Sequence, residues 1–212
     1  MNDRRRVPRL VLASASPARL RTLRGAGLAP TVVVSSVDEA RAAAGCAGAA
    51  EVALVLARAK CEDVAGGGVI GDQPGALVLG CDSVLELDGQ VLGKPASTAE
   101  ATLRWRDMRG RDGVLHTGHW LRDLSSGRAV GEVASTRVWF ADLSETEIGA
   151  YVQSGEPLQV AGAFTIDGLG GAFVTRIEGD PHNVVGVSLP LLRVLLARLG
   201  VVWTDLWAHA PG

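Results

Sequence analysis

Several features that mark membrane, secreted and nucleic-acid-binding proteins are missing from this sequence. Its 212 residues carry a formal net charge of −2, so no overall positive field favours nucleic acid or an anionic membrane surface. We expect no signal peptide at the N-terminus. The most apolar region, residues 184–202, contains Pro190, Arg193 and Arg198, which is typical of a core helix and strand and not of a membrane span. We therefore expect neither a membrane nor nucleic acid as a partner.

Common cofactor and metal motifs are absent as well. The chain has three cysteines, Cys46, Cys61 and Cys81. They form no C-x-x-C pair, and their odd number favours a reducing cytoplasm over an oxidising compartment. Residues 168–171 lack the spacing of a G-x-G-x-x-G dinucleotide motif, and the chain contains no G-x-x-x-x-G-K-[ST] phosphate loop. The four histidines, of which His209 is the last, show no zinc-binding spacing, and His116 and His119 are expected on opposite faces of a strand.

The chain has enough apolar residues for a substantial core, since 47% of them are hydrophobic. Alternating strand and helix patterns predict one α/β domain over residues 1–212, with a mixed sheet, flanking helices and two lobes. Residues 1–8, with the basic run 4–6, are expected to be a flexible, solvated tail, and residues 66–75 a flexible connection. The predicted strands are 10–13, 31–34, 76–79, 84–87, 90–92, 114–121, 129–140 and 172–177. The predicted helices are 17–26, 50–63, 98–108, 145–151 and 188–199, and capping boxes at 97–100 and 144–147 are expected to begin two of them. Asp88-Gly89 predicts a hairpin turn between the strands 84–87 and 90–92.

The segment 12–19, L-A-S-A-S-P-A-R, leads from a short apolar strand directly into a helix. Ser16 is typical of an N-cap, and Pro17 is typical of the first helical position. A helix N-terminus attracts anions through its free N–H groups and its dipole, and Ser14, Ser16 and Arg19 would add further donors. Phosphate is the anion we expect, although a capping serine and a first-turn arginine also occur at junctions that bind no ligand.

Ionisable residues stand at four other turns or element ends. Asp38 and Glu39 follow the second strand, Lys60 lies beside the apolar face of the helix 50–63, and Lys94 lies between a glycine and a proline. Each has a simpler interpretation: Asp38 and Glu39 as helix-start acids, Lys60 as a surface lysine whose stem lies along apolar residues, and Lys94 as a solvated loop charge. Asp82 is harder to explain in this way. It follows the buried strand 76–79, at the carboxyl end where α/β sheets place ligands, so it needs a metal, a lysine or a polarised water as partner.

Taken together, these residues match the needs of phosphoanhydride chemistry. The cations and the helix end would hold phosphates, and the acids would hold a divalent metal. One of the acids would also position the attacking water. The residue types alone do not decide which acid has which role.

Ten short motifs resemble those of the Maf nucleotide pyrophosphatases in order and spacing. They are S-A-S-P-A-R (14–19), V-D-E (37–39), C-D-S-V (81–84), L-G-K-P (92–95), H-T-G (116–118), G-E-P (155–157), A-G-A-F (161–164), D-G-L-G (167–170), I-E-G-D (177–180) and N-V-V-G (183–186). The resemblance extends from about residue 10 to residue 199. Each fragment is weak alone, but the ordered series is specific.

The resemblance implies a two-lobed mixed α/β fold with a cleft, related to the inosine triphosphatases. It also implies hydrolysis of a nucleoside triphosphate to the monophosphate and pyrophosphate, with Mg²⁺, Mn²⁺ or Co²⁺ as cofactor, in a cytoplasmic homodimer. Asp82 matches the catalytic acid of the family, which takes the proton from water, and it would bind the metal together with Glu39. The residues that would hold the triphosphate are Ser14, Arg19, Lys60 and Lys94.

Three positions depart from the family pattern. Ala18 replaces the first of two arginines, a loss that would weaken phosphate binding by about 1.5–3 kcal/mol if that arginine makes a charged hydrogen bond. Ser83 replaces the common threonine and keeps the hydroxyl. Asp167 stands where the branch acting on thymidine and uridine triphosphates has glutamine, which removes an amide donor near the base. We predict a pyrimidine substrate such as dTTP or UTP, or a modified nucleotide, with Asp167 among the substrate-binding residues.

Two other functions fit the same residues. One is a nucleotide-binding regulator of cell division or septum formation with little turnover, a role that the resemblance to the family implies. The other is a different phosphoanhydride or phosphomonoester hydrolase. Release of pyrophosphate, release of orthophosphate, or binding without turnover would distinguish the three.

Overall fold

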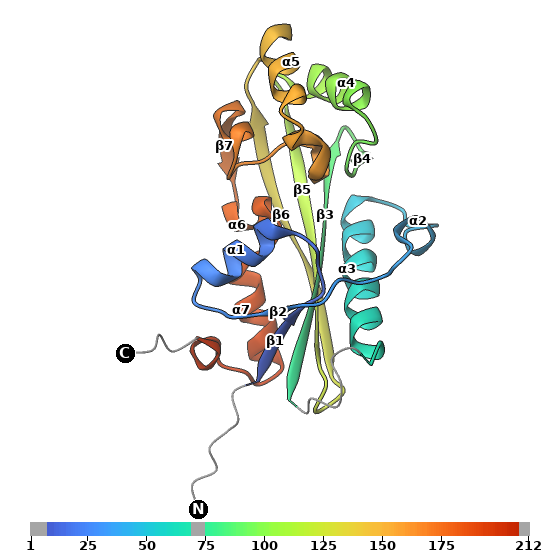
Figure 1. Ribbon diagram of the computed structural model, residues 1–212, viewed down its shortest axis with the longest axis vertical. Helices are drawn as coiled ribbons and strands as arrows, with labels where there is room; N and C mark the ends of the chain where they lie inside the picture. The colour runs from blue at the N-terminus through green and yellow to red at the C-terminus, as the bar shows by residue number, and fades with distance from the viewer. Residues whose placement is uncertain (1–7, 69–74, 208–212) are drawn as a thin grey trace, which may run out of the picture.

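The computed structural model describes residues 8–68 and 75–207 (Figure 1). Three sequence predictions concern residues outside these ranges: the tail up to residue 7, the middle of the connection 66–75, and the absence of a metal at His209. Within the described ranges, no helix is both long enough and apolar enough to cross a bilayer.

Strands and helices alternate along much of the chain. The strands are β1 (Arg9–Leu12), β2 (Thr31–Val32), β3 (Ala76–Leu87), β4 (Gln90–Leu92), β5 (Asp112–Asp123), β6 (Ala129–Phe140) and β7 (Val174–Glu178). The α-helices are α1 (Pro17–Gly25), α2 (Glu39–Ala42), α3 (Ala49–Gly66), α4 (Thr98–Met108), α5 (Glu145–Gln153), α6 (Pro181–Val185) and α7 (Leu189–Arg198). The 3-10 helices are η1 (Glu156–Gln159), η2 (Ala161–Ala163), η3 (Leu169–Phe173) and η4 (Trp203–Leu206).

These strands form one mixed sheet in the order β2-β1-β3-β5-β6-β7, and β4 pairs with β3. β1 runs parallel to β2 and β3, whereas the other neighbouring strands are antiparallel. In Figure 1, α3 covers one face of the sheet, and α1, α6 and α7 lie on the other. The predicted mixed α/β fold with flanking helices is confirmed.

Serine side chains start four of the predicted helices. Ser16 accepts a hydrogen bond from the Arg19 N–H at 3.4 Å and places Pro17 at the first position of α1. Ser144 forms the predicted capping box with Glu147 at the start of α5. Ser97 and Ser188 cap α4 and α7 in the same way. At α4, however, the Glu100 carboxylate accepts from Ala96 N and not from the capping residue, so the reciprocal half of the predicted box is missing.

One strand prediction was wrong, and it concerns the candidate site. The predicted strands 76–79 and 84–87 are a single strand, β3, so Asp82 lies in the middle of a strand and not at its carboxyl end. Cys81 before Asp82 and Val84 after it are buried, and β5 pairs with β3 without interruption from Leu77 to Glu86. The continuity is possible because Lys60 of α3 approaches the Asp82 carboxylate and provides its counter-charge.

Several strand boundaries also differ from the predictions, and for β2 and β7 the structure shows the reason. β2 ends at Val32 because its neighbour β1 ends opposite it at Leu12. β7 begins at Val174, two residues later than predicted, because the preceding residues form η3. There, Gly170 N donates a hydrogen bond to the Glu156 carboxylate at 3.0 Å, which holds the segment in a tight turn.

The core consists of two large hydrophobic clusters at opposite ends of the sheet. The lower cluster in Figure 1 joins β1 and α7 to one half of the long strands, with Leu12, Leu79, Leu121 and Leu195 among its members. The upper cluster joins α4 and α5 to the other half of these strands, with Leu85, Trp105, Leu115 and Phe140 among its members. β3, β5 and β6 run without a break through both clusters. The strands therefore hold the two ends together.

Two glycines allow α3 to pack unusually close to the sheet. A Cβ atom at Gly80 of β3 would lie 2.1 Å from the Ala57 carbonyl oxygen, and one at Gly118 of β5 would lie 2.2 Å from the Ala53 carbonyl oxygen. Both contacts are with helix backbone, so neither is relieved by rotating a side chain. Because α3 lies this close, its side chains reach the sheet at the level of Asp82.

One edge of β3 is open at this same level. β1 pairs with that edge up to Leu79, and β4 pairs with it from Leu85 onward. Among the described residues, no strand occupies the edge between these two points, at residues 80–84. We call this opening the edge gap. It lies between the upper and lower clusters and contains Asp82 and Ser83.

His119 of β5 connects the sheet to α7. Its Nε2 atom accepts a hydrogen bond from Ser188 N at 2.8 Å, and its Nδ1 atom donates to the Thr117 carbonyl oxygen at 3.0 Å. The ring is therefore neutral with the proton on Nδ1. Burial lowers the pKa of His119 to about 4 from its ordinary value of 6.5.

We predict that Gly118→Ala destabilises the protein by about 3 kcal/mol or more, because the new methyl group overlaps the backbone of α3. The matched control is Gly149→Ala in α5, where nothing lies within 4 Å of the new Cβ atom. This control should stabilise the helix by about 0.5–1 kcal/mol. Urea unfolding of both variants measures the difference, and a Gly118→Ala protein as stable as the wild type would contradict the close packing.

We also predict that His119 makes the folded state less stable in acid. The unfolded chain binds a proton at this histidine near pH 6.5 and the folded state only near pH 4, so the free energy of unfolding falls as the pH is lowered between these values. The contribution of this residue is about 3 kcal/mol. Denaturant unfolding of the wild type and of His119→Gln between pH 7 and 4 tests this, since glutamine can accept from Ser188 N but takes up no proton. Equal pH dependence in the two proteins would refute the assignment.

Candidate active site

The helix start predicted to bind phosphate has its donors arranged around Ser14. After β1 ends, Ser14 Oγ accepts a hydrogen bond from Ser16 N at 3.2 Å and another from Arg19 Nη1 at 2.9 Å. Both lone pairs of the Ser14 hydroxyl are thereby used, and its proton remains available for an acceptor outside this loop. The residue is 6% exposed. Ser14 is thus a fixed donor at the positive end of α1.

Arg19 is a buried cation that is bound only to neutral groups. Besides Ser14, its guanidinium donates to the Gly186 carbonyl oxygen at 2.7 Å and to Ser83 Oγ at 3.0 Å. No carboxylate of the described residues forms an ion pair with it, although the residue is 9% exposed. A buried charge without a counter-ion is unfavourable, so this arrangement favours binding of an anion. Two of the five guanidinium N–H groups have no acceptor among the described residues.

On the other face of the sheet, Lys60 joins two acids. Its Nζ atom lies 2.5 Å from Asp82 Oδ1 and 2.8 Å from Glu39 Oε1. The side chains of Lys60 and Asp82 are largely buried, whereas that of Glu39 is 58% exposed. Asp38 caps the short helix α2 through the N–H of Arg41, which fixes the backbone at Glu39. The interpretation of Asp38 as a helix-start acid is therefore correct, and the one of Lys60 as a surface lysine is wrong.

Asp82 is a stronger base than an ordinary aspartate. Burial raises the pKa of Asp82, and Glu39 raises it further. The positive charges of Lys60 and Arg19 act in the opposite direction and offset part of the rise. A buried carboxylate with a raised pKa beside two cations can hold or accept a proton near neutral pH more readily than a solvated one.

Glu39 and Asp82 are the side chains that could hold a divalent metal. One oxygen from each lies within 2.8 Å of the same lysine nitrogen, so the pair already converges on one positive charge. Mg²⁺ is commonly bound by one or two carboxylates, with water and substrate phosphates in its other positions. Within the described residues, no group of three or more His, Cys, Asp or Glu side chains could hold a metal without such help. The residues therefore fit a metal that binds together with a phosphate.

The remaining two predicted residues lie apart from these groups. Lys94 is exposed and follows β4, and its backbone is anchored because the Gly93 carbonyl oxygen accepts from Gly162 N at 3.1 Å. Asp167 precedes η3, and its Oδ2 atom lies 3.1 Å from Arg21 Nη2 in α1. Neither touches Asp82 or Ser14, and their contacts with a substrate stay predictions.

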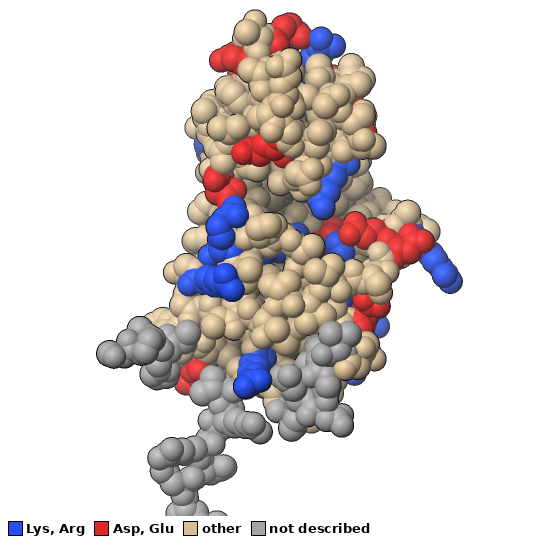
Figure 2. Space-filling model, viewed as in Figure 1, with Lys and Arg blue, Asp and Glu red and all other residues tan. Residues whose placement is uncertain are grey.

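The groups on the two faces meet at the edge gap. Asp82 and Ser83 are neighbours in β3, so their side chains point to opposite faces of the sheet. Asp82 meets Lys60, and Ser83 meets Arg19. In Figure 2 the surface is indented between the upper and lower parts of the molecule, and basic and acidic side chains gather along this indentation. A ligand in the edge gap could therefore contact groups from both faces.

Three residues that hold Arg19 in place were not predicted. Gly186 supplies a carbonyl oxygen, and Ser83 bonds to Thr117, its register partner in β5, with 2.9 Å between the hydroxyl oxygens. All three occur in the motifs quoted above, but their proximity depends on strand register and on the chain returning through α6. A serine and a threonine at paired positions are recognisable only once β3 and β5 are aligned.

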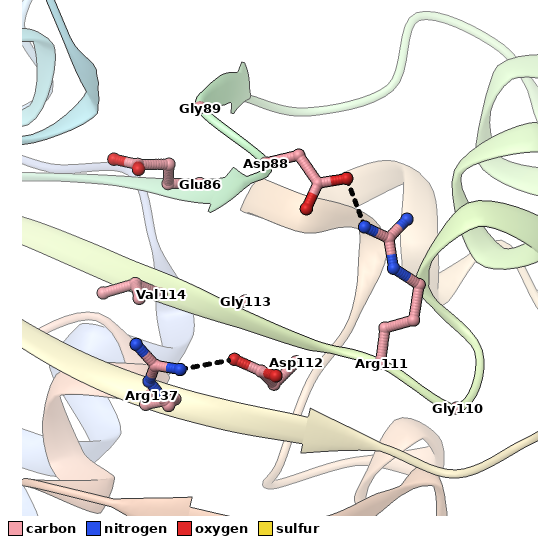
Figure 3. Close-up of a pocket in the computed structure, with 9 residues that line it drawn as sticks. All are labelled: Glu86, Asp88, Gly89, Gly110, Arg111, Asp112, Gly113, Val114 and Arg137. Atoms are coloured by element: carbon pink, nitrogen blue, oxygen red, sulfur yellow. Dashed lines mark hydrogen bonds and ion pairs between the residues drawn. The ribbon is translucent and has the colours of Figure 1, made fainter.

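A cavity of about 440 Å³ lies elsewhere, beside the β3–β4 turn (Figure 3). Four of its five charged lining residues pair with one another, Arg111 with Asp88 and Arg137 with Asp112. The fifth, Glu86, lies 3.3 Å from His116 Nε2. None of the predicted site residues lines it. Both arginines of this cavity thus have a carboxylate partner within the chain, unlike Arg19.

Comparison with known proteins agrees with the motifs. A family model described as "Maf-like protein" matches residues 9–199. A nucleoside triphosphate pyrophosphatase of Salinispora tropica is 58% identical over 201 residues, which are 95% of this chain and 88% of the relative. Proteins of the same name from Streptomyces coelicolor and Cutibacterium acnes are 59% and 51% identical, each over 95% of this chain and 96% of its own length. The chain therefore belongs to the Maf family.

Proposed function

We propose that this protein hydrolyses a nucleoside triphosphate to the monophosphate and pyrophosphate. The observation that carries the proposal is the meeting, at the edge gap, of a buried guanidinium without a counter-ion and a buried carboxylate with a raised pKa. The first suits a polyphosphate, and the second suits a water that must lose a proton. The names of the three relatives support the same reaction.

Each side of the edge gap has its own task in this proposal. Ser14 donates its hydroxyl proton, and Arg19 its two remaining N–H groups, to phosphate oxygens. Lys94 approaches the triphosphate from the β4 side. Asp82 accepts a proton from the attacking water, and Lys60 orients the Asp82 carboxylate through the contact at 2.5 Å.

A divalent metal belongs to the proposal as well. Glu39 and Asp82 would hold it together with phosphate oxygens of the substrate. When bound, such an ion neutralises phosphate charge and lowers the pKa of a bound water. Because Glu39 is exposed on a short helix, it can adjust to the ion more freely than Asp82 can.

We further propose a pyrimidine substrate such as dTTP or UTP, or a modified nucleotide. The sequence resemblance supports this, and so does the chemistry of the Arg21–Asp167 pair. Uracil and thymine present one N–H donor between two carbonyl oxygens, which complements a carboxylate beside a guanidinium. Cytosine has an acceptor in place of that N–H, and it would face the carboxylate unfavourably.

The state of the protein in the cell is part of the same proposal. The resemblance supports a single-domain protein that acts as a homodimer in the cytoplasm. Sedimentation analysis of the purified protein tests the dimer directly.

We predict that Asp82→Asn lowers kcat by about 10²–10⁴-fold, the usual contribution of a general base. The matched control is Asp88→Asn, in the exposed turn after the same strand, which should leave kcat unchanged. Pyrophosphate release with Mg²⁺ measures both, and thermal unfolding shows whether each variant is folded. A folded Asp82→Asn protein with turnover close to the wild type would rule out Asp82 as the base.

The substrate proposal predicts pyrophosphate from dTTP and UTP at a higher kcat/KM than from CTP, dATP or dGTP. The panel should include Mn²⁺ and Co²⁺ beside Mg²⁺, as well as methylated nucleotides. Orthophosphate in place of pyrophosphate would indicate a different hydrolase. Tight nucleotide binding with no product from any member would indicate the regulator.

A further inference from the structure

Four groups form a chain of hydrogen bonds that begins at Arg19 and ends in the core. Arg19 Nη2 lies 3.0 Å from Ser83 Oγ, and Ser83 Oγ lies 2.9 Å from Thr117 Oγ1. Thr117 Oγ1 in turn lies 3.1 Å from the carbonyl oxygen of Asn183. This series of hydrogen bonds crosses from α1 over β3 and β5 to α6.

The direction of every bond in this chain is determined. A carbonyl oxygen only accepts, so Thr117 uses its single proton on Asn183. Thr117 must then accept from Ser83, and Ser83 uses its own proton for this bond. Arg19 only donates, so Ser83 accepts from it. The protons therefore point from Arg19 toward Asn183 without an alternative arrangement.

The last acceptor in the chain is itself immobile. Asn183 is fully buried, and its side-chain amide donates to the Leu115 carbonyl oxygen at 3.2 Å and to Thr136 Oγ1 at 3.0 Å. These contacts tie α6 to β5 and β6. Ser83 therefore presents a lone pair to Arg19 in a fixed direction, because its proton cannot turn toward the guanidinium.

We infer that Ser83 and Thr117 are positioning residues for the phosphate site, acting through Arg19. They hold the guanidinium so that its other nitrogen bonds Ser14, which leaves the Ser14 proton directed outward. The inference rests on the proposed function, since the triphosphate is the anion that Arg19 and Ser14 would bind. The hydroxyl protons of Ser83 and Thr117 are both used in these hydrogen bonds, so neither residue donates a hydrogen bond to the substrate.

The test compares Ser83→Ala and Thr117→Val with the wild type. Two quantities are measured: KM and kcat for the preferred nucleotide, and the Kd of inorganic tripolyphosphate with Mg²⁺ by calorimetry. We expect KM and Kd to rise about tenfold, which corresponds to about 1.4 kcal/mol, while kcat changes less than threefold. Ser83→Thr keeps the hydroxyl and should stay within twofold of the wild type.

A double-mutant cycle shows whether Ser83 acts through Arg19. In an Arg19→Lys background, Ser83→Ala should raise Kd less than twofold further, because the guanidinium that it positions is gone. The matched control is Thr102→Val, which removes a hydroxyl that donates to the Thr98 carbonyl oxygen in α4, outside the site. It should leave KM and Kd unchanged. Thermal unfolding of each variant identifies any that fail to fold, and Thr117→Val and Ser83→Ala can each decide the question alone.

Several results would overturn the inference. Unchanged Kd in both single variants would do so. The same would follow if Ser83→Ala raised Kd in the Arg19→Lys background by as large a factor as in the wild type. A lower melting temperature with unchanged KM and Kd would mean that these hydrogen bonds only stabilise the fold. If the wild type releases no pyrophosphate but binds tripolyphosphate, the proposed function fails while Kd still tests the positioning. If it neither turns over nor binds, both fail.

Discussion

The contact between Lys60 and Asp82 is the interaction on which the candidate site depends. A carboxylate in the middle of a buried strand is tolerable only with a cation beside it, because removing one member of such a pair leaves a charge in a poorly solvated place. The cation comes from α3, which reaches the sheet because Gly80 and Gly118 have no side chains. The uninterrupted strand and the position of the helix thus have one common origin. Burial in this strand raises the pKa of Asp82, and the charge of Lys60 offsets part of that rise.

The two buried cations of the site serve different purposes. Lys60 is matched by carboxylates, so its charge is largely neutralised before any ligand arrives. Arg19 is surrounded by hydroxyl and carbonyl oxygens, which fix its orientation and leave its charge uncompensated. One cation therefore tunes an acid, and the other attracts an anion. They lie on opposite faces of β3, although the charge of Arg19 also lowers the pKa of Asp82 across the strand.

Local features of the fold were predictable from the sequence, since they depend on neighbours in the chain. The capping serines at Ser16 and Ser144 and the Asp88-Gly89 turn are of this kind, because each uses hydrogen bonds or backbone angles within a few residues. Family motifs likewise identified the family. Such reasoning needs no knowledge of what lies across the sheet.

Features that depend on distant parts of the chain were not predictable in this way. The charge at Asp82 suggested the end of a strand, because the sequence does not reveal that Lys60, 22 residues earlier, would neutralise it. Ser83 and Thr117 are 34 residues apart, and only the register of β3 against β5 brings them together. The contact of Arg19 with Gly186 spans 167 residues. Strand register and helix placement had to be seen before these contacts could be named.

The edge gap has a mechanical consequence. At the level of Asp82 the sheet is reduced to β3, β5 and β6, since Asp82 pairs with Gly118 and Gly118 pairs with Val133. These three strands pass through this narrow waist as continuous backbone. Because these strands connect the upper and lower clusters at this level, the clusters cannot rotate about a hinge loop there. Any change in the width of the edge gap must come from twisting of three hydrogen-bonded strands. Such twisting is resisted by the strand pairing, so the width of the site is largely set before a ligand binds.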